Sequence, residues 1–321
     1  MEILILHPGG LGDILLSLPA IRLLRSQFPS ASFTIAANID YLAPVAHGYA
    51  ERVISLAALP LHRLYAPEAL TDEEALFWKA FDRIVSWTGS GNSEFVRNLK
   101  RIHPDACIAS WRPGPEEPSH VSRLFVDSLG IGIASRTTPP PACILLDSES
   151  RTQGLQWLME RGWEEQDSLV ALHPGAGSVD KRWPLSRFIR LAQGLALRKS
   201  IKLLLIEGPA ETGLAMQIVK AIPAEKTILA ASLPLNLLAA VMGRCKMFTG
   251  NDSGVAHLAA ALRIRTVVLF GPTLPQHWAP LGENVSVLRN PSGCEACASG
   301  PGPHTCLDDI SVDEVLGSLG A

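Results

Sequence analysis

Residues suited to anion binding and proton transfer are concentrated in loops that follow apolar runs. Near the N-terminus, Gly10 and Gly12 separate the apolar residues 3–6 from a stretch with helical spacing that begins at Ile14. Glycine lets the backbone approach a ligand closely, and amides at a helix N-terminus attract anions. Asp13 falls in the first helical turn, where it is either a helix cap or a general base near the end of a strand. The sequence leaves both interpretations open.

A second loop combines glycines with cations. Gly175 and Gly177 follow the apolar run 169–172, and Lys181 stands shortly before a helix predicted from residue 185. Free amides together with a compact ammonium group are typical of a diphosphate site. The alternative is a solvated basic loop. We favour phosphate binding because the glycines and the cation occur together.

A third loop places small polar residues before an alanine-rich helix. Asp252 or Ser253 is suited to cap that helix, whose positive end attracts anions, and Gly254 follows them. His257 lies in the first helical turn; the alternative for it is a histidine that faces the core. Glu211 follows another predicted strand, and suits either ribose hydroxyls or the favourable end of the next helix.

Four residues near the C-terminus have the spacing of a zinc site. Cys294, Cys297, His304 and Cys306 lie within 13 residues, in a stretch rich in glycine and proline. Thiolate and imidazole are the usual ligands of structural zinc. The sequence therefore predicts a structural metal site as one alternative, and a group of reduced, inert thiols as the other.

These loops require strands and helices that alternate along the chain. Strands are predicted at residues 3–6, 33–37, 53–56, 83–87, 106–110, 169–172, 202–207, 227–230, 246–249 and 266–270. Helices are predicted at residues 14–25, 73–81, 94–102, 120–129, 151–161, 185–198, 212–221, 235–245 and 256–262. The alternation indicates an α/β protein with doubly wound parallel sheets. Beyond Arg289 we expect irregular structure.

The chain is expected to form two similar domains. The turns Leu6-His7-Pro8-Gly9 and Leu172-His173-Pro174-Gly175 repeat one sequence, each after an apolar run and before a predicted helix. Three consecutive prolines at residues 139–141 exclude a helix or a central strand there. We therefore place one domain at residues 1–150 and a second, with the cysteine-rich tail, at residues 151–321.

Composition excludes several classes of protein. The formal net charge is −3 and 18% of residues are charged, which argues against a nucleic-acid-binding protein with a basic face. No apolar run approaches the roughly 20 residues that span a bilayer. The apolar N-terminus has no basic residues before it and ends at a turn, so we expect no signal peptide and a cytoplasmic protein with reduced cysteines.

The first loop matches a dinucleotide-binding fingerprint only in part. Gly10 and Gly12 supply Gly-x-Gly, but Leu15 stands where the third glycine belongs. An NAD(P)-dependent oxidoreductase is therefore an alternative rather than the favoured function.

Taken in order along the chain, these motifs resemble those of the ADP-heptose:lipopolysaccharide heptosyltransferase family, glycosyltransferase family 9. The resemblance covers residues 1 to about 306. It is carried by Gly9-Gly10-Leu11-Gly12-Asp13, Ser17-Leu18-Pro19-Ala20, His173-Pro174-Gly175-Ala176, Lys181-Arg182-Trp183-Pro184, Gly208-Pro209-Ala210-Glu211, Asn251-Asp252-Ser253-Gly254 with His257, and Phe270-Gly271-Pro272-Thr273.

The resemblance implies a GT-B fold, in which two Rossmann-like domains face one another across a cleft, the first for the acceptor and the second for the nucleotide sugar. It implies an inverting transfer of heptose from ADP-heptose to a lipid-linked or core saccharide, with no cofactor and no catalytic metal. Asp13 resembles the base and Lys181 the phosphate contact. Glu211 resembles a ribose contact, and Asp252, Ser253, Gly254 and His257 resemble the donor-binding loop.

Two further points stay open at this stage. A protein that binds nucleotide sugars or glycans without catalysis is a second alternative to the transferase. Transient association with the inner membrane surface is also open. The sequence shows no strongly amphipathic basic helix, which is the feature that would predict such association.

Overall fold

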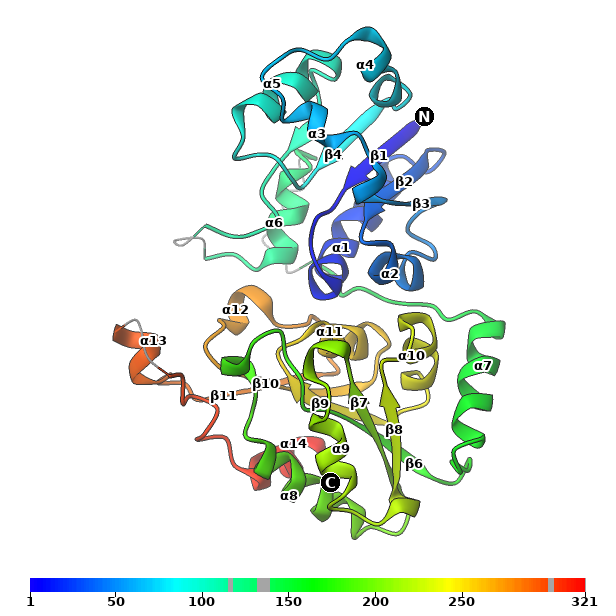
Figure 1. Cartoon of the computed structure of the whole chain (residues 1–321), viewed down its shortest axis with the longest axis vertical. Helices are drawn as coiled ribbons and strands as arrows, with labels where there is room; N and C mark the ends of the chain where they lie inside the picture. Colours follow the sequence, from blue (N-terminus) through cyan, green and yellow to red (C-terminus); the bar gives the residue numbers. More distant parts are fainter. Residues whose placement is uncertain (115–117, 132–138, 300–302, 321) are drawn as a thin grey trace. The chain divides into compact units, whose positions relative to one another are not determined.

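The computed structural model describes residues 1–114, 118–131, 139–299 and 303–320, and the chain forms two compact units, Met1–Ala142 and Cys143–Ala321 (Figure 1). The division falls eight residues before the boundary expected from the sequence. Residues after 142 belong to the second unit; there, the amide of Ile144 donates to the carbonyl of Ala261. Of the proline-rich stretch, residues 132–138 lie outside the described residues.

The first unit is built on a parallel sheet in the order β3-β2-β1-β4-β5. This is the order of a nucleotide-binding α/β fold, in which the chain runs outward from β1 in one direction and then returns to continue on its other side. The strands are β1 (Glu2–Leu6), β2 (Ser32–Ala37), β3 (Arg52–Ser55), β4 (Arg83–Ser86) and β5 (Cys107–Ile108).

Helices cover both faces of this sheet. Leu4 and Leu6 of β1 belong to a buried cluster that also contains Trp78, Phe95 and Leu99. These three aromatic and aliphatic residues come from helices on one face, while α1 and α6 pack against each other. The helices are α1 (Leu11–Gln27), α2 (Ile39–Leu42), α3 (Leu61–Leu64), α4 (Asp72–Lys79), α5 (Ser93–Ile102) and α6 (Val121–Ser128), with short 3-10 helices η1 (Ala43–Val45) and η2 (Leu56–Ala58).

The second unit repeats this topology with one more strand. Its parallel sheet has the order β11-β10-β9-β6-β7-β8. Numbered from β6, this is the 3-2-1-4-5-6 order of the Rossmann fold. The strands are β6 (Ser168–His173), β7 (Ile201–Glu207), β8 (Thr227–Ala231), β9 (Met247–Asn251), β10 (Arg265–Phe270) and β11 (Val285–Arg289).

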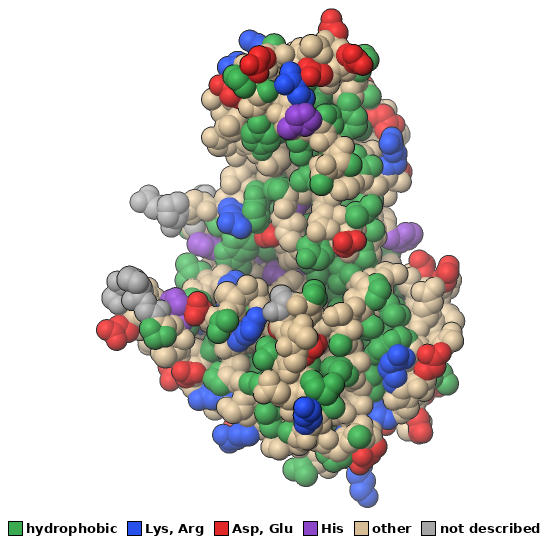
Figure 2. Space-filling model, in the orientation of Figure 1, with side chains coloured by type: hydrophobic (Ala, Val, Ile, Leu, Met, Phe, Trp, Pro, Cys, Tyr) green, Lys and Arg blue, Asp and Glu red, His purple; other side chains and the backbone are tan. Residues whose placement is uncertain are grey.

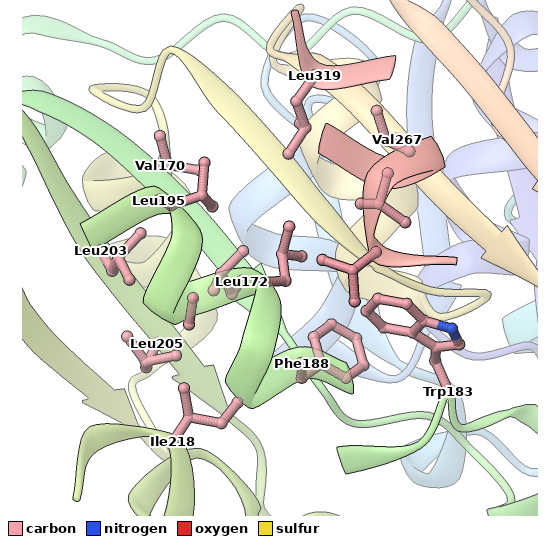
Figure 3. Close-up of a cluster of buried hydrophobic side chains, with 14 of the residues drawn as sticks. Val170, Leu172, Trp183, Phe188, Leu195, Leu203, Leu205, Ile218, Val267 and Leu319 are labelled. Carbon is pink, nitrogen blue, oxygen red and sulfur yellow. The ribbon is translucent and has the colours of Figure 1, made fainter. Parts of the chain in front are cut away.

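The main core of the second unit lies between this sheet and three helices, α8, α9 and α14 (Figure 3). Phe188 and Leu195 of α8, Ile218 of α9 and Leu319 of α14 pack on apolar side chains of the sheet. On the helix pair α7–α10, a Cβ on Gly154 would fall 2.6 Å from the carbonyl carbon of Ala240, so only glycine allows this close approach. The helices are α7 (Ser148–Met159), α8 (Leu185–Ala196), α9 (Leu214–Val219), α10 (Leu235–Met242), α11 (Gly254–Ala261), α12 (Pro275–Trp278), α13 (Glu295–Ser299) and α14 (Val312–Leu319), with η3 (Val179–Lys181), η4 (Pro209–Glu211) and η5 (Ala224–Lys226).

The expectation of irregular structure beyond Arg289 is wrong for the two helices α13 and α14, of which α14 is the longer. Ser311 accepts from the amide of Glu314, and the Glu314 carboxylate accepts from the amide of Ser311. This capping box starts a helix whose Val315 and Leu319 are fully buried. The signal was present in the sequence as Ser-x-x-Glu before an apolar pattern.

Cationic and anionic side chains are interspersed over the face shown in Figure 2. Among the described residues, no helix is both long and apolar enough to cross a membrane.

Candidate functional site

The predicted donor loops of the second unit meet where its sheet changes direction. β6 and β9 are hydrogen-bonded neighbours, although two strands separate them in sequence. The chain leaves their carboxyl ends toward opposite sides of the sheet, which opens the crevice that commonly binds ligands in such folds. Gly175 and Gly177 follow β6, whereas Asp252, Ser253 and Gly254 follow β9. The structure thus brings together two loops that lie about 75 residues apart.

Asn251, the last residue of β9, ties these loops to each other. Its side-chain Nδ2 donates to the carbonyls of Pro174 and Gly175, at 2.9 and 3.2 Å. Its Oδ1 accepts from the amide of Trp183 at 2.9 Å. Asn251 is fully buried, so each of these bonds replaces a hydrogen bond to water that folding removes. The sequence places Asn251 in a family motif but predicts no role for its side chain.

A buried polar chain joins three loops through His173. Its Nε2 lies 2.8 Å from Oε1 of Glu211, and its Nδ1 lies 3.2 Å from the hydroxyl of Ser253. The hydrogen bond with His173 lowers the pKa of Glu211. An ionised carboxylate only accepts hydrogen bonds, so Nε2 is the donor in this pair. These hydrogen bonds fix the ends of β6 and β7 relative to the loop after β9.

Glu211 also explains why residue 175 is glycine. A Cβ at that position would lie 2.3 Å from the carboxyl carbon of Glu211. The Oε1 atom of Glu211 accepts from the amide of Gly208 at 3.1 Å as well, which closes a tight turn after β7. Of the two interpretations of Glu211 from sequence, the structure shows a turn-closing carboxylate at the start of a short helix, and contact with a ribose stays a prediction.

Lys181 pairs with an acid of the third loop. Its Nζ donates to Oδ2 of Asp252 at 2.8 Å. The lysine side chain is 32% exposed and the aspartate 7% exposed. Lysine has three N–H donors, and this pairing uses one of them. The pair therefore holds a cation at a partly open position, next to the N-terminal end of α11.

The helix α11 is not capped as the sequence suggested. Ser253 occupies the N-cap position, but its hydroxyl makes no capping hydrogen bond and contacts His173 instead. Asp252 pairs with Lys181. Neither side chain therefore caps the helix, and the first-turn amide of Ala256 donates to the backbone carbonyl of Ser253 at 3.1 Å. His257 lies in that first turn and is buried, and its contact with a donor stays a prediction.

In the first unit, Asp13 closes the turn that starts α1. Its Oδ2 accepts from the amide of Gly10 at 2.9 Å, so Asp13 takes part in the capping box as the third helical residue, whereas the N-cap itself is Gly10. Gly12 lies inside the helix. Gly9 has a role that its sequence motif does not predict, because a Cβ there would fall 2.5 Å from Cβ of Asp13 and 2.7 Å from the His7 ring. A side chain at position 9 would displace the Asp13 carboxylate. The assignment of Asp13 as a base stays a prediction.

His7 is buried behind this loop, against two aromatic rings. Its ring centroid lies 5.6 Å from that of Trp87 and 5.5 Å from that of Phe125. Its Nδ1 accepts from the amide of Gly9 at 3.1 Å. Burial lowers the pKa of His7 from 6.5 to about 4, so the ring is neutral near neutral pH. His7 therefore supports the glycine turn as an acceptor, not as a cation.

The four metal-ligand candidates of the tail also come together. Each of these residues offers one ligand atom, and the four atoms all lie within 4.8 Å of one another. The residues are Cys294, Cys297, His304 and Cys306. The cluster contains no residue of the β6–β9 loops.

Comparison with known proteins agrees with this arrangement. The family model of glycosyltransferase family 9 (heptosyltransferase) matches residues 119–306. The chain belongs to this family. It is therefore a glycosyltransferase, which sets aside the oxidoreductase alternative. Lipopolysaccharide heptosyltransferase 2 of Salmonella typhimurium is 24% identical over 350 residues, which cover 99% of this chain and 97% of the relative.

Solved structures show that this glycosyltransferase has the GT-B fold. The glycosyl transferase of family 9 from Veillonella parvula superposes with a TM-score of 0.81 at 22% identity, covering 99% of this chain and 95% of the other. The ADP-heptose heptosyltransferase II of Escherichia coli superposes with a TM-score of 0.77 at 20% identity, covering 100% and 98%. The expected class of two Rossmann-like α/β domains with parallel sheets is confirmed.

The buried histidine of the glycosyltransferase's first unit generates a prediction about pH. Between pH 6.5 and about 4, the unfolded chain binds a proton at His7 that the folded protein does not bind. Stability contributed by the neutral ring is therefore present above pH 6.5 and declines as the pH falls toward 4. Protonation of His7 should therefore lower the free energy of unfolding by up to about 3 kcal/mol over this pH range.

Urea titrations at intervals from pH 7 to 4.5 measure this effect. His7→Asn keeps an acceptor for the Gly9 amide but has no group that titrates in this range. Its free energy of unfolding should decline less over this range than that of the wild type. The exposed His62, changed to Asn, is the control and should keep the wild-type slope. Parallel curves for wild type and His7→Asn would contradict the assignment.

Proposed function

We propose that this glycosyltransferase moves a heptose from ADP-heptose to a saccharide of the lipopolysaccharide core, with inversion at the anomeric carbon and without a catalytic metal. The observation that carries the proposal is the site at the ends of β6 and β9. There, a lysine held by a buried acid stands beside the N-terminus of α11. Family membership supplies the reaction class.

The diphosphate of the donor is assigned to this pair of features. The N-terminal end of α11 carries partial positive charge, and the first-turn amides beginning at Gly254 suit phosphate oxygens. Lys181 adds a full charge with two N–H donors beyond the one given to Asp252. Asp252 is then a positioning residue, and Ser253 and His257 line the same end of the helix. Fixed charges of this kind stabilise the leaving diphosphate without a metal ion.

Glu211 is assigned to the ribose of the donor. Its hydrogen bonds with His173 and with the Gly208 amide both fall on Oε1. Oε2 is the oxygen that we assign to a ribose hydroxyl. Since the pKa of Glu211 is lowered, the carboxylate is ionised at neutral pH and accepts strongly.

Asp13 of the first unit is assigned as the general base. It takes the proton of the acceptor hydroxyl while that oxygen attacks the anomeric carbon on the face opposite ADP. The bond from the anomeric carbon to the ADP oxygen breaks, and its electron pair leaves with ADP. The amide of Gly10 fixes the carboxylate in the first turn of α1, which limits its rotation.

The donor and the stereochemistry are tested directly by turnover. We expect transfer from ADP-heptose to a heptose-deficient core acceptor without added divalent ions, and a product whose anomeric configuration is opposite to that of the donor by NMR. UDP- and GDP-sugars should neither turn over nor raise the melting temperature. A retained configuration would overturn the inverting mechanism, and turnover only with a UDP- or GDP-sugar would overturn the donor.

Substitution of Asp13 tests the base. Asp13→Asn keeps an oxygen that accepts from the Gly10 amide, so the turn and the fold should persist. We expect kcat to fall by about 10²- to 10⁴-fold, because the proton acceptor is lost, with little change in KM for the donor. Asp40→Asn, an exposed first-turn acid of α2, is the matched control with wild-type kcat. A kcat of Asp13→Asn within a few-fold of wild type would show that another group accepts the proton.

Substitution of the lysine–aspartate pair tests the phosphate site. Lys181→Met leaves the buried Asp252 carboxylate next to the diphosphate, so kcat/KM for the donor should fall by about 10²- to 10³-fold. Adding Asp252→Asn to this variant removes the uncompensated charge and should restore part of the loss. Lys220→Met, at an exposed position of the same unit, should behave as wild type. If the double variant is no better than Lys181→Met alone, the acid does not act through the lysine.

A further inference from the structure

The cysteine–histidine cluster of the tail has the dimensions of an occupied metal site. The Sγ atoms of Cys294 and Cys297 are 3.7 Å apart. Nδ1 of His304 lies 3.5 Å from Sγ of Cys294 and 3.4 Å from Sγ of Cys297. Cys306 completes the group, with all four ligand atoms within 4.8 Å of one another.

The three distances among Cys294, Cys297 and His304 fit the edges of a tetrahedron around zinc. Zn–S bonds of about 2.3 Å and Zn–N bonds of about 2.05 Å, at tetrahedral angles, place two sulfurs about 3.8 Å apart and a sulfur about 3.5 Å from a nitrogen. A disulfide would bring two sulfurs to about 2.05 Å, which is much shorter than the separation of Cys294 and Cys297. The thiols are therefore spaced for a shared ion and not for a covalent bond.

We propose that Cys294, Cys297, His304 and Cys306 bind one structural Zn²⁺ ion. Three sulfurs and one imidazole nitrogen are a typical ligand set of structural zinc. The protein supplies all four ligands, so no coordination position is left for a water molecule or a substrate. Such a closed site has no part in the transfer reaction.

The ion would fasten the tail to the core of the second unit. Cys306 is buried, and the next residue, Leu307, belongs to the main apolar cluster. A few residues on, the carbonyl of Ile310 accepts from Nε1 of Trp183 at 3.0 Å and from the guanidinium of Arg187. The metal ligands thus anchor the segment that contacts Trp183.

Trp183 connects this segment to the loop of Lys181. It stands two residues after the lysine, its ring is buried, and its amide donates to Asn251. Zinc binding would therefore help to hold Lys181 in place. This last step rests on the proposed donor role of Lys181, whereas the metal site itself does not.

Metal analysis of the full-length protein tests the site. Protein purified without chelators should contain one zinc per chain by mass spectrometry of the metals. Replacement by Co²⁺ should give the intense visible bands and sulfur-to-metal charge-transfer bands of a tetrahedral thiolate site. One iron per chain in place of zinc would overturn the choice of metal. Less than about 0.1 metal ion per chain after growth and reconstitution in excess zinc would overturn the site.

Two substitutions separate metal binding from folding. Cys297 is exposed, so Cys297→Ser leaves no cavity, and the variant should lose most of the zinc. The Co²⁺ ions that it still binds in excess cobalt should each show about two thirds of the wild-type charge-transfer intensity, because two thiolates remain of three. The melting temperature should fall by about 5 to 10 °C, because the metal stabilises only the folded state. Cys107→Ser, in the other unit, is the control and should keep one zinc per chain.

The readouts distinguish this proposal from the proposed function. Zinc content and melting temperature do not depend on any sugar donor, so these measurements test the metal site independently of the proposed function. If Cys297→Ser keeps its zinc, the ligand assignment is wrong. If it loses zinc with an unchanged melting temperature, the structural role is wrong. If it loses zinc and stability but keeps the wild-type KM for the donor, the link to Lys181 is wrong.

Discussion

The site in the second unit depends on the need to satisfy buried polar groups where parallel strands end. At the carboxyl ends of β6 and β9 the ladder stops, and the carbonyls of Pro174 and Gly175 lose their strand partners. The side-chain amide of Asn251 donates hydrogen bonds to both carbonyls, and its oxygen accepts one from the amide of Trp183. An unpaired buried polar group costs roughly 1–3 kcal/mol. One asparagine therefore fixes the glycine turn and the start of α8 in the geometry on which the donor loops depend.

The repeated Leu-His-Pro-Gly turns show how one sequence serves two purposes. Both histidines are buried at the carboxyl end of a central strand, His173 as the last residue of β6 and His7 directly after β1, yet their partners differ. His7 accepts from an amide within its own turn and packs on Trp87 and Phe125, so it acts as a neutral, local support. His173 bonds to Glu211 and Ser253 from two other loops, so it joins distant parts of the chain. Duplication of a turn thus fixes where a histidine lies, and the loops around it decide what it does.

The sequence predicted the fold well because apolar periodicity and glycine turns are local signals. The strands β1 to β4 and β6 to β10 lie within a few residues of their predicted positions. The candidate loops after β1, β6, β7 and β9 were also found, because each has glycine at a strand end. The bridging roles of Asn251 and His173 were missed, since they arise from contacts between segments far apart in sequence. The role of Gly9 was missed as well, because it depends on how closely the turn brings His7 and Asp13 together. The spacing of Cys294 and Cys297 was visible in the sequence, but the convergence of all four ligand atoms was not.

The pairing of Lys181 with Asp252 places a carboxylate beside the proposed anion site, and that negative charge by itself disfavours phosphate. Two effects favour the pair. A lysine side chain loses up to about 2 kcal/mol of conformational entropy when it is fixed, and Asp252 imposes that loss before the donor arrives. The carboxylate is also buried behind a partly exposed lysine, so the ammonium group lies at the open side of the pair. In the proposed function, a diphosphate at α11 meets an ordered cation and a helix N-terminus together. The acid lowers the net charge of the site, but in exchange the remaining charge is fixed in position, and fixed charge is what stabilises a leaving group.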